Sequence, residues 1–352
     1  MRVSWEVFHV ETAHPFGISR GVKTGDDVVW VRLEHEGIEG LGEADPSGYY
    51  GETAETVEAA LRRLAPRLEE VEDPFRLENI ERDLASLLGR NGSARCAISS
   101  ALHDWVGKRV GLPLWKLWGL DPAEAPLSSF TIGIDAPEVM ARRTREAEAW
   151  PILKIKLGSD DDEARLSAVR GAAPDKILRV DANAAWTPAE AVEGIAMCAE
   201  YGVEFVEQPL PPAENDELAF VRSRAVLPIV VDESSIVASD IPRLDGLVDG
   251  INIKLAKCGG PREALRMIHT ARACGLSVML GCMLETSLGI APAAHLASLV
   301  DYADLDGAAL LRSDPFTGPH LEEGRIVLPD RPGLGVERAA PLERSRALAP
   351  GR

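Results

Sequence analysis

Lysines and acids recur in this chain at the ends of short apolar segments that have the character of β-strands. Residues 153–157, Leu-Lys-Ile-Lys-Leu, place Lys154 and Lys156 on one face of such a strand, because strand side chains alternate. The aliphatic face should pack against outer helices, so both ammonium groups should point inward. Later apolar segments end, in chain order, in three acids and one further lysine: Asp181, Glu207, Asp232 and Lys254.

These acids have the spacing and setting of a metal site. Carboxylates at the carboxyl ends of neighbouring barrel strands converge on one mouth, where they would repel each other strongly if left unpaired. A hard divalent cation removes that repulsion, and an all-oxygen ligand set with open water positions favours Mg²⁺. We therefore expect Asp181, Glu207 and Asp232 to bind one Mg²⁺ per subunit. The alternative is that each acid only caps a following helix.

Lysines on both flanks of such a site suggest proton transfer at a carbon next to a carboxylate. One lysine would remove the proton, the metal would stabilise the enolate, and the other lysine would return a proton to the opposite face. Nearby positive charge and partial burial lower the pKa of a lysine, so that it can act as a base near neutral pH. For the strand at 153–157 taken alone, a solvated lysine face remains the alternative.

The elements that position these residues change character along the chain. Residues 3–10 and 27–35 alternate like antiparallel strands, and a turn at Glu36-Gly37 leads into a return strand. Helical periods follow from Thr53. From about residue 126, short β-rich segments alternate with helical ones in units of about 25 residues. This rhythm predicts parallel β/α units and a barrel of the (β/α)₈ type.

Five motifs together resemble the enolase superfamily, muconate-lactonising subgroup, over essentially the whole chain. They are KIK at 154–156, DAN at 181–183, EQP at 207–209, DES at 232–234 and NIK at 252–254.

The resemblance implies an α/β fold, a modified (β/α)₇β TIM barrel with an α+β capping domain. Residues 1–120 would form the cap, completed by about 321–352, and residues 121–320 would form the barrel. Lys156 and Lys254 would be the acid/base pair, with Lys154 neutralising the substrate carboxylate. The metal ligands would again be Asp181, Glu207 and Asp232.

The last β-rich segment, at 302–307, bears on substrate choice. Asp304 and Asp306 share a face, so both should enter the site, distant from the metal ligands. Two carboxylates there would pair with a cation such as an α-ammonium group. A D-x-D at this position resembles the dipeptide epimerases of the subgroup. A solvated pair of loop acids is the alternative.

The same resemblance implies further substrate contacts. Thr131, Cys282 and Leu284 would contact the dipeptide, although Cys282 could equally be a small buried residue. Arg20, in the loop between the first two strands, would meet an acidic side chain, with Lys23 as the competing candidate and a surface arginine as the alternative. The resulting expectation is the conversion of L-Ala-L-Glu to L-Ala-D-Glu.

Composition excludes several other classes of function. The chain has 352 residues, with 38 Lys plus Arg against 56 Asp plus Glu and a formal net charge of −18. This balance argues against a nucleic-acid binder or a basic membrane-surface protein. There is no apolar run long enough for a membrane helix, and the five cysteines are far apart, which favours a reducing cytoplasm. We expect a small-molecule dipeptide substrate and a homo-oligomer.

Other enzyme and non-enzyme classes fit less well. A Schiff-base barrel enzyme would need an inward lysine but not three carboxylates. A non-catalytic, metal-stabilised binding protein would have no use for lysines on both flanks. Within the superfamily, an N-acylamino-acid racemase, an o-succinylbenzoate synthase or a muconate cycloisomerase is the alternative. Asp304 and Asp306 argue against these three activities.

Overall fold

An eight-stranded parallel sheet forms the centre of the computed structural model, which describes residues 1–212 and 215–339. The strands follow one another in chain order from β4 to β11. A bridge between Ser128 and Ala303 joins the first and last strands and closes the sheet into a barrel. The strands are β4 (Phe130–Ile132), β5 (Ile152–Lys156), β6 (Ile177–Asp181), β7 (Val203–Glu207), β8 (Ile229–Val231), β9 (Gly250–Lys254), β10 (Ser277–Gly281) and β11 (Tyr302–Asp304).

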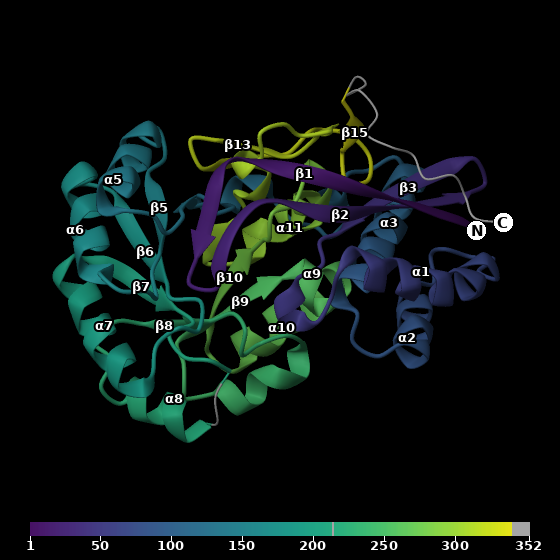
Figure 1. The fold of residues 1–352 in the computed structure, drawn as a ribbon. Helices are drawn as coiled ribbons and strands as arrows, with labels where there is room; N and C mark the ends of the chain where they lie inside the picture. The colour runs from purple at the N-terminus through teal and green to yellow at the C-terminus, as the bar shows by residue number, and fades with distance from the viewer. Residues whose placement is uncertain (213–214, 340–352) are drawn as a thin grey trace.

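Helices cover the outside of the barrel (Figure 1). A short 3₁₀ helix, Ala238–Leu244, replaces an α-helix between β8 and β9, and β11 is followed only by the 3₁₀ helix Gly307–Leu310. This arrangement confirms the predicted modified barrel. Among the described residues, no helix combines the length and the apolar character that crossing a membrane requires. The helices are α5 (Pro137–Glu146), α6 (Asp162–Ala172), α7 (Pro188–Glu200), α8 (Asn215–Arg222), α9 (Leu255–Cys258), α10 (Pro261–Ala273) and α11 (Ser287–Leu296).

Strand alternation separates the barrel core from its charged interior. On β5, Leu153 and Ile155 are fully buried in the hydrophobic cluster shared with the surrounding helices. Lys154 and Lys156, on the other face, are also buried but contact carboxylates of the barrel. The aliphatic face thus packs outward as the sequence predicts, and the lysines are left inside.

The amino-terminal part is an antiparallel three-stranded sheet covered by helices, which confirms the predicted α+β cap. The hairpin of β1 and β2 extends from the cap helices over the barrel (Figure 1). The amide of Ile134, just after β4, donates to the carbonyl of Gly17 at 2.8 Å and ties the hairpin end to the barrel. The elements are β1 (Arg2–Ile18), β2 (Gly21–His35), β3 (Ile38–Ala44), α1 (Ala54–Glu69), α2 (Leu77–Leu87), α3 (Gly92–Val110) and α4 (Leu114–Leu117).

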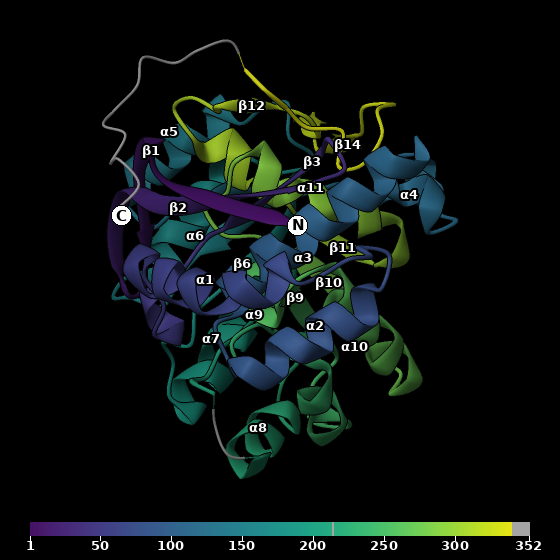
Figure 2. The same ribbon diagram turned by 90° about the vertical axis from the view of Figure 1, so that its right-hand side faces the viewer.

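Charged side chains contribute to the attachment of the cap to the barrel. In Figure 2, α2 lies beside α10, where Glu78 pairs with Arg266 at 3.4 Å. On β3, buried Glu43 accepts hydrogen bonds from Trp30 Nε1 at 3.0 Å and from the amide of Thr286 at 2.9 Å. Glu43 therefore holds the loop that enters α11 against the cap sheet.

The carboxyl-terminal segment returns to the cap through short strands. Buried Asp104 of α3 accepts hydrogen bonds from the amides of Leu41 and Leu334, both at 2.8 Å, and so joins β3 to this segment. The predicted completion of the cap by about 321–352 extends into 340–352, which lies outside the described residues. The strands of this segment are β12 (Phe316–Thr317), β13 (His320–Glu322), β14 (Arg325–Val327) and β15 (Glu337–Arg338).

The close contact between β3 and α3 requires glycine at position 42. A Cβ atom there would lie 2.0 Å from the carbonyl oxygen of Ala97 in α3. Overpacking of this kind costs about 1–3 kcal/mol, so we expect Gly42→Ala to lower the thermal unfolding midpoint by several degrees. Gly171→Ala in α6 is the matched control, because a Cβ there meets nothing within 4 Å among the described residues. Equal unfolding midpoints for the two variants would contradict this account.

Candidate active site

A cavity of about 360 Å³ lies between the cap loops and the carboxyl ends of the barrel strands. Both predicted catalytic lysines line this cavity, and so does every predicted substrate-binding residue. The structure therefore brings together residues from both ends of the chain. The predicted residues in the lining are Arg20, Lys23, Thr131, Lys154, Lys156, Lys254, Cys282, Leu284, Asp304 and Asp306.

The three predicted metal ligands lie next to these lining lysines but do not reach the cavity surface. Asp181, Glu207 and Asp232 are at most 1% exposed. Asp181 Oδ2 is 2.6 Å from Lys156 Nζ, and Asp232 Oδ2 is 2.8 Å from Lys254 Nζ. The acids thus form a buried layer, with ammonium groups between them and the cavity.

Strand register explains why these groups meet. Lys156 is the register partner of Asp181, and Asp181 is the partner of Glu207. Residues that end neighbouring parallel strands in register stand at the same height in the barrel. Lys154 lies two residues before Lys156 on β5 and therefore deeper in the barrel. Its ammonium group lies 2.6 Å from Glu207 Oε2.

The net effect of burial and neighbouring charges is to raise the pKa of both Glu207 and Lys254. Burial and the nearby charge of Asp181 raise the pKa of Glu207 to about 7. Burial opposes the charge on Lys254, but the charges of Asp232, Glu207 and Glu233 together outweigh it and raise the pKa of that lysine. Among the protein groups alone, the acids therefore hold Lys254 as an ammonium ion. A lowered lysine pKa would need additional positive charge at the acids.

The oxygen atoms around this layer fit a hard divalent cation. Asn183 Oδ1 and Asn252 Oδ1 are buried without a hydrogen-bond partner among the described residues. They adjoin Asp181 and Glu207, to which the same two amide groups donate through Nδ2. Carboxylate and amide oxygens are the ligands that Mg²⁺ prefers. Asp181, Glu207 and Asp232 are therefore suited to hold Mg²⁺.

The acids are not gathered into a ready-made cluster. In residues 1–212 and 215–339, no group of three or more acid, histidine or cysteine side chains stands in metal-binding arrangement. The reason is visible in the contacts, because lysine ammonium groups stand between the carboxylates. Holding a cation would require Lys156 and Lys254 to turn away from Asp181 and Asp232.

The expectation that the D-x-D pair is distant from the metal ligands is wrong. Asp304 Oδ2 lies 2.7 Å from Lys154 Nζ, which also contacts Glu207, so one ammonium group joins the two sets of acids. Barrel closure brings β11 near β5, and the long lysine side chain spans the gap. Asp304 Oδ1 accepts from Ser129 Oγ at 2.6 Å, and Asp306 Oδ2 accepts from the amide of Thr131 at 2.6 Å.

The two D-x-D acids differ in charge preference. Although burial alone would raise it, the Lys154 ammonium holds the pKa of Asp304 below its usual value. Burial, together with the charge of Asp304, raises the pKa of Asp306 to about 7. Among the described residues, Asp306 is therefore the member of the pair with no lysine or arginine at ion-pair distance, so a cationic ligand group would stabilise its charged form.

Arg20 lies at the cavity rim but already has partners in the barrel. Its Nη1 atom donates to the carbonyl of Asn183 at 2.7 Å and to Glu233 Oε1 at 2.9 Å. Its guanidinium carbon lies 4.3 Å from the ring centroid of Tyr49, in the 3₁₀ turn Gly48–Tyr50 that follows β3. Lys23 instead pairs with Asp26 on its own hairpin. Arg20 is thus the residue that links the cap loops to the barrel mouth.

Glu233, Asn252 and Asp45 are among the residues of this site that were not assigned a role from the sequence. Glu233 pairs with Arg20, and Asn252 donates to Glu207. Both lie inside motifs, DES at 232–234 and NIK at 252–254, in each of which another residue was assigned a role. Their place in these motifs was the signal that could have identified them. Asp45, at the end of β3, is buried against the cavity and its Oδ1 has no hydrogen-bond partner among the described residues. No spacing pattern indicated it.

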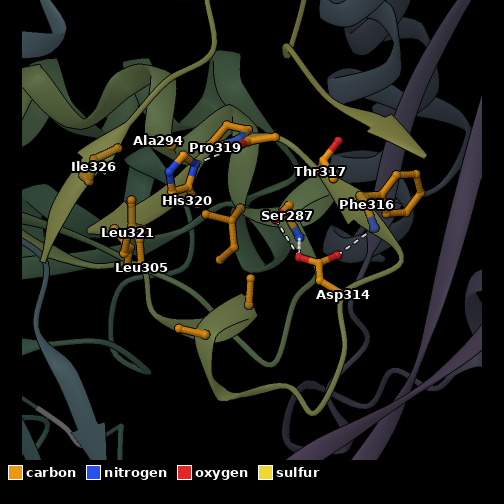
Figure 3. Close-up of a pocket in the computed structure, with 14 residues that line it drawn as sticks. Ser287, Ala294, Leu305, Asp314, Phe316, Thr317, Pro319, His320, Leu321 and Ile326 are labelled. Atoms are coloured by element: carbon orange, nitrogen blue, oxygen red, sulfur yellow. Dashed lines mark hydrogen bonds between the residues drawn. The ribbon is translucent and has the colours of Figure 1, made fainter. Parts of the chain in front are cut away.

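A second cavity, of about 470 Å³, lies between α11 and the carboxyl-terminal strands (Figure 3). Its walls are mainly apolar, and its acid, Asp314, accepts hydrogen bonds from Ser287 and from the amide of Phe316. These donors occupy both carboxylate oxygens, and the only other titratable side chain in the described lining is His320, with no lysine beside it. The smaller cavity is therefore the candidate active site.

Comparisons with known proteins show what this chain is similar to as a whole. A family model described as mandelate racemase/muconate lactonizing enzyme, N-terminal domain, matches residues 2–119, and one described as enolase C-terminal domain-like matches residues 138–340. An L-Ala-D/L-Glu epimerase from Bacteroides thetaiotaomicron is 40% identical over 338 residues, which cover 96% of this chain and 88% of the relative.

Two solved structures are similar over nearly the whole chain. A dipeptide epimerase from Enterococcus faecalis, in complex with Mg and L-Leu-L-Tyr, is 35% identical with a TM-score of 0.91 and covers 96% of this chain and 99% of its own. A substrate-liganded L-Ala-D/L-Glu epimerase from Bacillus subtilis is 32% identical with a TM-score of 0.91 and covers 97% and 99%.

Metal binding by the acid layer can be tested without any substrate. We expect isothermal titration calorimetry to detect one Mg²⁺ per chain. Glu207→Gln removes a charged ligand and should weaken binding at least ~10-fold, or about 1.4 kcal/mol. Glu204→Gln on the same strand is the control, because Glu204 pairs with Arg179 away from the acid layer. Unchanged binding in Glu207→Gln would contradict the assignment.

Proposed function

The chain belongs to the mandelate racemase/muconate lactonizing enzyme family of the enolase superfamily, and within it we propose a dipeptide epimerase. The enzyme would invert the α-carbon of the C-terminal residue of an L,L-dipeptide. One observation carries this proposal: Lys156 and Lys254 line the same cavity from β5 and β9, which are separated by the three acid-bearing strands. Two ammonium groups on opposite flanks can serve the two faces of one carbon.

The proposed chemistry is a proton transfer between these lysines through the substrate. One lysine, as the neutral amine, takes the α-proton from its face, and the other, as the ammonium, gives a proton to the opposite face. In the reverse reaction the two exchange roles. Lys154 contributes positive charge beside the substrate carboxylate. Mg²⁺, when held by Asp181, Glu207 and Asp232, supplies Lewis-acid stabilisation of the negative charge that develops on that carboxylate.

The remaining lining residues support a dipeptide with a free amino end. Asp306, whose pKa burial raises to about 7, would take up the substrate ammonium group together with Asp304. Thr131, Cys282 and Leu284 would contact the dipeptide. We choose Arg20 over Lys23 for an acidic side chain, because Arg20 reaches the barrel mouth whereas Lys23 pairs with its own hairpin. L-Ala-L-Glu is therefore the proposed substrate, as for the relative from Bacteroides thetaiotaomicron.

One observation favours a second candidate function. Asp304 already has Lys154 and Ser129 as partners, so half of the D-x-D pair is neutralised within the protein. An N-acylamino-acid racemase, whose substrate has no ammonium group, would need no more than this. Asp306 has no ion-pair partner among the described residues, so it could bind the ammonium group of a dipeptide. This supports the dipeptide over the acylated amino acid.

We further propose a homo-oligomer in the cytoplasm, in which each subunit binds one Mg²⁺ and one dipeptide. All five cysteines carry free thiols, which suits a reducing compartment. The resemblance to the family supports the assembly. The residue ranges proposed for the cap and the barrel remain 1–120 with 321–352, and 121–320.

Replacing either flanking lysine should stop the reaction in both directions. Each direction needs one base and one acid, so Lys156→Ala and Lys254→Ala should each lose epimerisation of L-Ala-L-Glu and of L-Ala-D-Glu. In D₂O, we expect each variant to retain α-proton exchange with only one of the two epimers. Exposed Lys116 provides the control, and Lys116→Ala should keep wild-type rates. Near wild-type epimerisation by either site variant would refute the two-lysine mechanism.

Substrate choice can be measured as kcat/KM across a small panel. L-Ala-L-Glu should exceed L-Ala-L-Lys, L-Ala-L-Phe and N-acetyl amino acids. Breaking a buried ion pair on one side costs about 3–5 kcal/mol, so Asp306→Asn should lower kcat/KM for the free dipeptide by roughly 10²–10³-fold. An N-acetylated dipeptide should lose far less in that variant. A preference for N-acetyl compounds would favour the racemase, and a preference for another dipeptide would overturn only the role of Arg20.

A further inference from the structure

Lys257 is a fully buried lysine next to the acid layer that the proposed proton transfer does not use. It lies on the short helix α9, three residues after Lys254, and its side chain is 0% exposed. Its Nζ donates to the main-chain carbonyls of Asp232 at 2.7 Å, Ser235 at 3.2 Å and Asn252 at 3.2 Å. It also donates to Asp232 Oδ1. An ammonium group has three protons, so these acceptors use all of its donor capacity.

The carboxylate of Asp232 is therefore held differently at its two oxygens. Oδ1 is bound by Lys257, which is absent from the lining of the substrate cavity, whereas Oδ2 is 2.8 Å from Lys254, which lines it. Lys257 is also fixed by carbonyls from two separate segments. Lys254 can turn toward a substrate, but Lys257 cannot leave without stranding those carbonyls. Only Oδ2 can therefore exchange its partner.

The cap helix α3 keeps the main chain around Lys257 in place. A Cβ atom at Gly92, the first residue of α3, would lie 2.1 Å from the carbonyl oxygen of Lys257. A Cβ atom at Gly260 would lie 2.6 Å from Ser99 Cβ in the same helix. The cap therefore packs directly against the main chain of Lys257. This packing restricts the position from which its side chain reaches Asp232.

We propose that Lys257 is a positioning residue that fixes the carboxylate of Asp232 so that Oδ2 alone is presented to Mg²⁺. This inference rests on the metal site of the proposed function, but it does not depend on the identity of the substrate. A different role, as a mere counter-charge, makes the opposite prediction. Removing a positive charge would then make the site more negative, and the cation would bind more tightly.

Mg²⁺ titration of Lys257→Met by calorimetry, with no dipeptide present, separates the two roles. Groups that orient a metal ligand typically contribute 10–100-fold to metal affinity, so we expect the variant to bind Mg²⁺ roughly 10–100-fold more weakly. The matched comparison is Lys254→Met, which removes the same charge from the other oxygen of Asp232. It should bind Mg²⁺ as tightly as the wild type or more tightly. Unchanged or tighter binding in Lys257→Met would overturn the proposal.

A double-mutant cycle distinguishes positioning from a general loss of structure. If Lys257 acts through Asp232, adding Lys257→Met to Asp232→Asn should weaken Mg²⁺ binding no further. Additive losses would show that Lys257 only supports the fold and would contradict the proposal. If Lys257→Met does not fold, Lys257→Gln keeps a donor for the carbonyls and takes its place in every comparison.

The outcomes also separate this inference from the proposed function. Failure of the wild type to bind Mg²⁺ would contradict the metal site itself, and with it the positioning role. Normal Mg²⁺ binding without turnover of any dipeptide would contradict only the proposed substrate. A weakened Lys257→Met in that second case would still support the positioning role, because its readout is metal affinity.

Discussion

Burial of several carboxylates at one level of the barrel is the constraint on which the rest of this structure depends. Asp181, Glu207 and Asp232 are almost fully shielded from water, where unpaired charges are costly. Buried lysines neutralise them at hydrogen-bond distance. Breaking one such pair leaves an uncompensated buried charge, so the lysines and acids must be considered as one unit. The groups proposed to move protons are therefore also the groups that make the site stable.

The cap contributes to this unit from outside the barrel. Arg20 reaches from the β1–β2 turn to Asn183 and Glu233, both next to proposed metal ligands. Glu43 of β3 binds the amide of Thr286 at the start of α11. The cap therefore closes the cavity and fixes two loops of the barrel mouth.

Much of this arrangement could be predicted because it follows from strand alternation and register. A lysine or acid at the end of an apolar strand must face the barrel mouth, which identified the inward lysines, the three acids beneath the cavity and the D-x-D pair. The other substrate-binding candidates came from the family resemblance. Contacts that depend on barrel closure could not be predicted in this way. Spacing along the chain does not show that Lys154 spans from β5 to Asp304 on β11. The direction of Lys257 likewise depends on a short helix whose packing against α3 is set by glycines.

The central claim is that the buried lysines and acids together place one substrate α-carbon between two lysines. A crystal structure of the protein with Mg²⁺ and L-Ala-L-Glu would test this claim most directly. The account predicts an α-carbon of the C-terminal residue between Lys156 Nζ and Lys254 Nζ, both released from Asp181 and Asp232, whose oxygens contact the cation together with Glu207. An α-carbon bound away from either lysine, or a cation held by other residues, would contradict it.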